Sequence, residues 1–238
     1  GHKKYKMAHE AAEHIFEKFP NLAEGRKVDG DIFLAENKPD KAIESYLLAY
    51  KIKPNYKFLY KITDLIVEYQ GPDAAIEFLE NKLDKNSFKP IHHKMAEIYS
   101  SQKSFEKVER HYKILLSEYP DDINAINNLA DIYLQQKKDS AFGLAQKAFR
   151  LAPENPMVAS TYAQAHMQKG LYPKAIEMLE KTIKVSSGAL RNNIKYHLAE
   201  AYFLSGEKMK AKKILIDLSN EKKSFSQQSK VNSLLLKI

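Results

Sequence analysis

The sequence contains no cysteine, and glycine is scarce, with 8 among 238 residues. The lack of cysteine excludes disulfides and thiol chemistry. The glycines form neither a G-x-G-x-x-G pattern nor a phosphate loop, because Asp31 follows the suitably spaced Gly25 and Gly30 where that loop requires lysine. Long apolar runs are absent too, and no stretch approaches the roughly 18 apolar residues of a transmembrane helix. These absences argue against thiol chemistry, phosphate-loop nucleotide binding and a membrane span.

Arginine is also rare, although the formal net charge is +8. The other 34 of the 38 basic residues are lysines, spread along the whole chain, and the four arginines are Arg26, Arg110, Arg150 and Arg191. A nucleic-acid-binding surface more often clusters arginine and lysine with aromatic residues between them. We therefore interpret the lysines as a solvated surface and expect no nucleic-acid partner.

Histidine is present without the spacing of a metal site. His9 and His14 lie five residues apart, so they do not share a helix face, and the adjacent His92 and His93 point in different directions. A zinc-binding helix needs histidines at i and i+4. The serines show no strand-to-helix elbow that would present a nucleophile. The sequence therefore predicts no catalytic residue, no metal and no cofactor.

Small residues recur at fixed places in predicted amphipathic helices. The pattern is clearest in two helices expected at 124–136 and 140–151, where Ala130, Ala141 and Ala148 leave room for close backbone approach. Two series of positions repeat along the chain. The first series is Gly30, Thr63, Ala96, Ala130, Ala163 and Ala199. The second series, with separations of 33, 33, 33, 34 and 36 residues, is Ala42, Ala75, Val108, Ala141, Ala175 and Ala211.

This pattern resembles the tetratricopeptide repeat (TPR), a helix–turn–helix unit of about 34 residues. The resemblance implies an all-α, right-handed α-solenoid, in which each unit buries its core against its neighbours. We expect a single solenoid over residues 3–238. Its full repeats are predicted at residues 22–54, 56–87, 89–120, 122–153, 156–187 and 189–219.

The two ends of the chain carry further expectations. Residues 3–20 predict the second helix of a truncated repeat, with Ala8, Ala12, Ile15 and Phe19 on its packing side. Gly1 and His2 have the sequence of a tag-cleavage scar. Residues 224–238 predict a C-terminal capping helix, apolar on one face and polar on the other.

Asp40 is expected to be the N-cap of the second helix in the first full repeat.

The TPR resemblance also implies a partner-binding groove lined by the first helix of each repeat. We call the groove positions that follow the small residues the acidic row. They are Asp31, Asp64, Glu97, Asp131, Gln164 and Glu200. Further groove positions are Lys27, Tyr60, His93, Asn124, Asn127, Asn193 and Tyr196.

The composition of the acidic row supports two readings. Stacked carboxylates would suit a protein or peptide partner with a lysine- or arginine-bearing segment. In the alternative, the acids only pair with lysines of the next helix. The lysine–asparagine clamp of chaperone-binding TPR domains is not reproduced, so chaperone tails are not expected as ligands.

From about residue 124 onward, the chain is similar to bacterial exopolysaccharide-associated TPR lipoproteins of the PEP-CTERM type. The segments that carry this resemblance include NNLADIYLQQ, LAQKAFRLAPENP and FSQQSKVNSLLLKI. It implies a scaffold in an envelope assembly for polysaccharide synthesis or export. A cytosolic TPR adaptor or regulator and a carbohydrate-binding solenoid are the alternatives.

Overall fold

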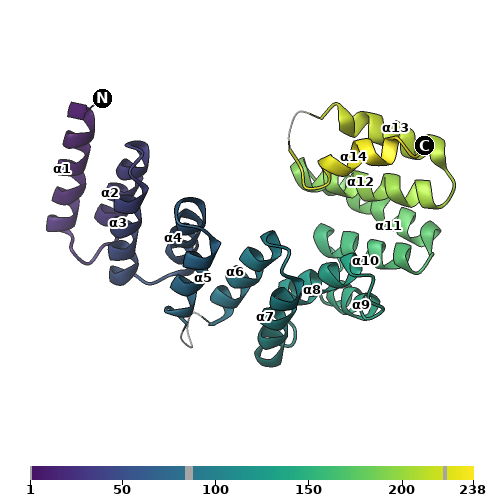
Figure 1. Cartoon of the computed structure of the whole chain (residues 1–238), viewed down its shortest axis with the longest axis horizontal. Coiled ribbons are helices and arrows are strands. Elements are labelled where there is room, and N and C mark those ends of the chain that lie inside the picture. The colour runs from purple at the N-terminus through teal and green to yellow at the C-terminus, as the bar shows by residue number, and fades with distance from the viewer. Residues whose placement is uncertain (1, 84–87, 222–223) are drawn as a thin grey trace. The chain divides into compact units, whose positions relative to one another are not determined.

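The computed structural model describes residues 2–83, 88–221 and 224–238. Within them the regular secondary structure is entirely α-helical (Figure 1), which confirms the predicted all-α class. None of the helices described has the length and apolar character that crossing a bilayer requires. Gly1 of the expected tag scar and Ser87, at the end of the second predicted repeat, lie outside the described residues.

The helices fall into two compact units, residues 1–111 (unit 1) and residues 112–238 (unit 2). Unit 1 contains α1 (His2–Lys18), α2 (Glu24–Ala35), α3 (Pro39–Ile52), α4 (Tyr56–Tyr69), α5 (Pro72–Glu80) and α6 (Phe88–Ser101), and the boundary falls within α7 (Phe105–Glu118). Unit 2 continues with α8 (Ile123–Gln135), α9 (Ala141–Leu151), α10 (Pro156–Gln168), α11 (Tyr172–Lys184), α12 (Gly188–Leu204), α13 (Lys208–Ser219) and α14 (Gln228–Leu235).

Within each unit, the helices with the most extensive contacts are neighbours in the chain. The helix pairs α2–α3, α8–α9, α10–α11 and α12–α13 form the most extensive contacts, and α3–α4, α9–α10 and α11–α12 join successive pairs. This neighbour-to-neighbour packing is the arrangement of an α-solenoid. The repeat boundaries given above stay a prediction.

The turns between paired helices close through one recurring hydrogen bond. A backbone N–H donates to the carbonyl five residues earlier, at N···O distances of 2.8–2.9 Å. In most of these turns the residue before the donor has a positive φ, including Lys103 and Lys137 as well as Gly170 and Gly206. This is the Schellman type of helix ending. The acceptor carbonyls belong to Phe33, Ile66, Tyr99, Tyr133, His166 and Tyr202.

The core follows the two repeating series. All the second-series residues, from Ala42 to Ala211, are at most 1% exposed. Gly30 shows why a small residue is needed in the first series: a Cβ there would lie 2.7 Å from the Tyr46 ring. The small side chains thus stand where helices come into close contact, as predicted.

The predicted capping helix is confirmed but shorter than expected. α14 covers Gln228–Leu235 rather than 224–238. Val231 and Leu234 of α14, with Phe225 before it, pack against Tyr196 of α12 and Leu215 of α13. The apolar face of the cap therefore closes the core of unit 2.

Two expectations were wrong. Asp40 is not an N-cap, because α3 begins at Pro39 and Lys38 holds the cap position. Proline fits the first helical turn, where no backbone donor is needed. Ile15 and Phe19 are 36% and 48% exposed and do not form the packing side of α1. α1 instead approaches α2 so closely that a Cβ on Gly25 would be 2.9 Å from the Cβ of Phe16.

Candidate functional site

The acidic row begins in unit 1 with an ion-paired carboxylate. Asp31 Oδ1 accepts hydrogen bonds from the Tyr46 hydroxyl and from Lys61 Nζ, both at 2.6 Å. Burial acts to raise the pKa of Asp31, but these bonds and the Lys61 charge outweigh it, so the pKa is lowered. Burial and the neighbouring Asp31 raise the pKa of Tyr46. Asp31 is therefore ionised and engaged by two donors of its own unit.

The next two carboxylates of the row share one lysine. Lys94 Nζ lies 2.6 Å from Asp64 Oδ1 and 2.8 Å from Glu97 Oε1. The Lys94 side chain is 5% exposed, whereas those of Asp64 and Glu97 are 62% and 66% exposed. Burial acts to lower the pKa of Lys94, but the two carboxylates outweigh it and the pKa is raised. All three acids of the row in unit 1 thus pair with lysine.

Two further groove positions of unit 1 also contact neighbouring residues. The Tyr60 hydroxyl donates to the Pro90 carbonyl at 3.1 Å, and Lys94 Nζ lies 5.4 Å from the Tyr60 ring centroid. His93 is half-buried. Lys27 pairs with Glu24 on the same helix at 3.3 Å.

Asp131, on α8 in unit 2, has a different environment. Its Oδ2 accepts a hydrogen bond from Gln135 Nε2 at 2.8 Å, and within the described residues it forms no ion pair. The residue thirty positions later, which is lysine for Asp31 and Asp64, is Thr161. Burial raises the pKa of Asp131, while the charges of His197 and Lys230 act in the opposite direction. This carboxylate is half-buried and has no cation in direct contact.

Unsatisfied polar atoms occur near Asp131. One turn earlier on α8, Asn127 is 5% exposed and its Oδ1 has no hydrogen-bond partner. His197 on α12 is 8% exposed, and its Nδ1 also lacks a hydrogen bond, although Glu200 Oε2 lies 3.6 Å away. Buried polar atoms are usually satisfied, and leaving one unpaired costs about 1–3 kcal/mol. Asn127 Oδ1 and His197 Nδ1 are therefore buried polar atoms whose hydrogen-bonding capacity is unused within the described residues.

The remaining predicted positions of unit 2 differ in exposure. Asn124 is exposed at the start of α8, and Gln164 on α10 donates to the Ser160 carbonyl at 3.4 Å. Asn193 Oδ1 accepts from the backbone N–H of Gln227 at 3.3 Å. Tyr196 is 5% exposed in the core beneath α14, where burial raises its pKa to about 12.

The structure therefore groups the predicted positions by unit. Asp31, Asp64 and Glu97 lie in unit 1, whereas Asp131, Gln164 and Glu200 lie in unit 2 on α8, α10 and α12. α10 packs against both α8 and α12, so the latter three belong to one packed set of helices.

Sequence reasoning offered lysine pairing as an alternative for the acidic row but did not name the basic residues of either group. Lys61 and Lys94 each follow their acid by thirty residues, a spacing visible in the sequence. The influence of His197 and Lys230 on Asp131 had no such signal, because it depends on how α12 and α14 fold.

Comparison with known proteins decides the fold. No protein-family model and no curated protein matches the sequence. Among solved structures, a tetratricopeptide repeat protein from Parabacteroides merdae has a TM-score of 0.67 at 17% identity, over 95% of this chain and 86% of its own. The chain has a tetratricopeptide-repeat fold.

Two further TPR-like neighbours support the same fold. A chain of the APC/C hetero-tetramer Cut9-Hcn1 has a TM-score of 0.67 at 14% identity, over 98% of this chain and 46% of its own. For pilF of Pseudomonas aeruginosa the TM-score is 0.60 at 16% identity, over 99% and 100%. Among these neighbours there is no counterpart of the narrower resemblance to exopolysaccharide-associated lipoproteins.

Proposed function

We propose that this protein is a noncatalytic scaffold that binds a protein partner on the face of α8, α10 and α12, at a site centred on Asp131. The observation that carries the proposal is the difference between the carboxylates of the acidic row. Asp31, Asp64 and Glu97 have lysine partners, whereas Asp131 has none within the described residues.

The chemistry of the site favours a cationic segment. A half-buried carboxylate without a cation has lost hydration that no ion pair replaces. A lysine or arginine side chain from the partner would supply that charge. The buried Asn127 Oδ1 and His197 Nδ1, which lack hydrogen-bond partners within the described residues, add to the polar character of the surroundings. Electrostatic complementarity of this kind contributes to specificity and to the association rate.

Neighbours with the same fold are compatible with this role. The hetero-tetramer that contains Cut9 and Hcn1 is, by its description, an assembly of different chains. We infer that this chain also binds a partner, through the side chains named above.

The test compares two matched variants, Asp131→Asn and Asp64→Asn, with the wild-type chain as immobilised baits. Each variant removes one carboxylate charge of the acidic row, and its fold is checked by circular dichroism. Partners captured from a native lysate are identified, and a synthetic peptide from the basic segment of each partner is titrated. We expect Asp131→Asn to weaken peptide binding at least tenfold, and Asp64→Asn to leave it within about twofold.

Equal binding by both variants and the wild type would contradict the assignment to Asp131. The lysate is separated into envelope and soluble fractions before capture. The fraction that holds the partner then distinguishes an envelope assembly concerned with polysaccharide, implied by the resemblance of the C-terminal half, from a cytosolic adaptor.

A further inference from the structure

α1 contacts the rest of unit 1 through both apolar and polar side chains. Among the described side chains of α1, Ala12 is the buried hydrophobic one, at 1% exposure, while Met7 is 61% exposed. The Tyr5 hydroxyl donates to the Ala35 carbonyl at 3.0 Å. Tyr5, Ala8 and Phe16 of α1 are half-buried, so polar contacts add to a modest apolar contact with α2.

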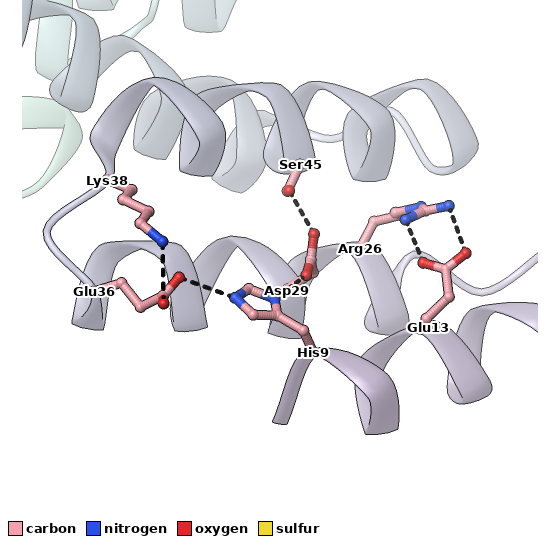
Figure 2. Close-up of polar contacts among 7 residues, drawn as sticks. All are labelled: His9, Glu13, Arg26, Asp29, Glu36, Lys38 and Ser45. Atoms are coloured by element: carbon pink, nitrogen blue, oxygen red, sulfur yellow. Dashed lines mark hydrogen bonds and ion pairs between the residues drawn. The ribbon is translucent and has the colours of Figure 1, made fainter. Parts of the chain in front are cut away.

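His9 forms the centre of these polar contacts (Figure 2). Its Nδ1 lies 2.6 Å from Asp29 Oδ1, and its Nε2 lies 3.1 Å from Glu36 Oε2. The ring packs 4.3 Å from the Phe33 ring, measured between centroids. The side chains are 23% exposed for His9, 16% for Asp29 and 8% for Glu36. Both ring nitrogens thus face a carboxylate oxygen in a sheltered position.

Other donors fix the two carboxylates in place. Ser45 Oγ on α3 donates to Asp29 Oδ2 at 2.7 Å, and Lys38 Nζ lies 3.1 Å from Glu36 Oε1. The acceptors that face His9 are therefore oriented by α3 and by the turn before it.

This geometry requires a particular protonation state. An ionised carboxylate only accepts hydrogen bonds, and a neutral imidazole has a single N–H. The neutral ring can therefore donate to Asp29 or to Glu36, but not to both. The lone pair on its unprotonated nitrogen then faces the negatively charged oxygen of the other carboxylate. The imidazolium ion donates to both. Burial acts to lower the pKa of His9, but the hydrogen bonds and charges of Asp29 and Glu36 outweigh it, and the pKa is raised.

We propose that His9 is a pH-operated latch, which fastens α1 to α2 as the imidazolium ion and loosens it as the neutral ring. The charged groups around the ring are Asp29 and Glu36 of the α2 side, with Lys38 paired to Glu36 and Lys41 5.7 Å from the Phe33 ring. On α1 itself, Glu13 is paired with Arg26 at 2.7 Å (Figure 2).

The direction of the pH effect follows from linkage. His9 binds its proton more tightly when α1 is docked. Its stabilisation of the docked state is therefore fully present below the ordinary histidine pKa of about 6.5. This stabilisation is lost as the pH rises through the higher pKa that His9 has in the docked state. Release uncovers the face of α2 that carries Gly25, Asp29 and Glu36.

The experiment measures amide hydrogen exchange of α1 in the full 238-residue chain as a function of pH, corrected for the intrinsic exchange rate. Amides of α4 serve as the internal reference. The variants are His9→Gln, which cannot change charge, and Arg26→Gln, which breaks the ion pair of Arg26 with Glu13 and leaves His9 in place. An NMR titration of the His9 ring gives its pKa directly.

In the wild type, we expect opening of α1 to increase with pH by at most about tenfold per pH unit above 6.5, with α4 unaffected. Arg26→Gln should open α1 more at every pH but keep the same pH dependence. His9→Gln should remove the dependence. If His9→Gln leaves α1 unprotected at all pH values, Glu36→Gln replaces it and should lower the His9 pKa and weaken the pH dependence.

Three results would each overturn the latch. The first is a wild-type α1 whose opening does not change across this range. The second is the same pH dependence in His9→Gln as in the wild type. The third is a His9 ring whose pKa is unchanged by Glu36→Gln.

Discussion

Lys94 Nζ lies 2.6 Å from Asp64 Oδ1, and the two side chains differ sharply in burial, with 5% of Lys94 and 62% of Asp64 exposed. The Lys94 ammonium group is therefore largely dehydrated, whereas the Asp64 carboxylate stays largely hydrated. Removing one partner is therefore not equivalent to removing the other, because only the lysine would remain buried and unpaired.

We predict this asymmetry in the free energy of unfolding. Lys94→Met should stay within about 1 kcal/mol of the wild type, because a side chain of similar volume fills the site and the carboxylates remain solvated. The double variant Asp64→Asn, Glu97→Gln should lose about 3 kcal/mol, because the ammonium group is then buried without a counter-charge. Urea unfolding followed by circular dichroism measures both values. Equal losses in the two variants would show that the charges of this cluster do not act as described.

A second prediction concerns acid stability and the pair formed by His92 and His111. Their Nδ1 atoms are 2.8 Å apart, and burial, with smaller contributions from His92 and nearby cations, lowers the pKa of His111 to about 4. Two imidazolium rings cannot share a hydrogen bond, so the folded state favours the neutral rings. Their contribution to stability is present above pH 6.5 and is lost as the pH falls towards 4.

Thermal unfolding between pH 7 and pH 4 measures this effect. One pKa unit corresponds to about 1.4 kcal/mol, and partial solvent screening limits the expected loss to about 2 kcal/mol. His111→Gln keeps a neutral hydrogen-bonding side chain and should flatten this part of the pH profile. A variant that loses as much stability on acidification as the wild type would place the acid sensitivity elsewhere. The effect is opposite in sign to that of His9, so the two can be separated.

A third prediction compares two helical glycines. At Gly30 an added Cβ would lie 2.7–2.9 Å from ring atoms of Tyr46, whereas at Gly143 it would meet nothing within 4 Å. Gly30→Ala should therefore cost about 1–3 kcal/mol through overpacking. Gly143→Ala should stabilise the protein by about 0.5–1 kcal/mol, because alanine favours the helix. Equal effects of the two substitutions would contradict the packing at Gly30.

The sequence predicts the fold well because the repeat pattern is the pattern of the core. Ala42 and its equivalents recur every 33–36 residues, and all are buried. Burial at these positions depends on helix geometry and on contact with the next helix. Both constraints recur in every repeat, so small or apolar residues recur in the sequence at a fixed spacing. The expectations for Ile15 and Phe19 were wrong because the apolar periodicity of α1 does not reveal which of its faces packs against α2.

The candidate site was less predictable. The sequence identifies the acidic row, but it does not show that Lys94 is buried between two members of the row while Asp131 has no ion pair. The distinction depends on how far long side chains reach across helices. The contacts of His9 were missed for the same reason, because they join residues twenty and twenty-seven positions apart.

The turn closures described above also bear on how the chain folds. Each donor amide is only five residues from its acceptor, as in the bond from Lys38 to Phe33 and the bond from Glu207 to Tyr202. Contacts this local require little loop closure and form quickly. During synthesis, a helix pair can therefore assemble once it has left the ribosome, before the residues that follow it have been translated.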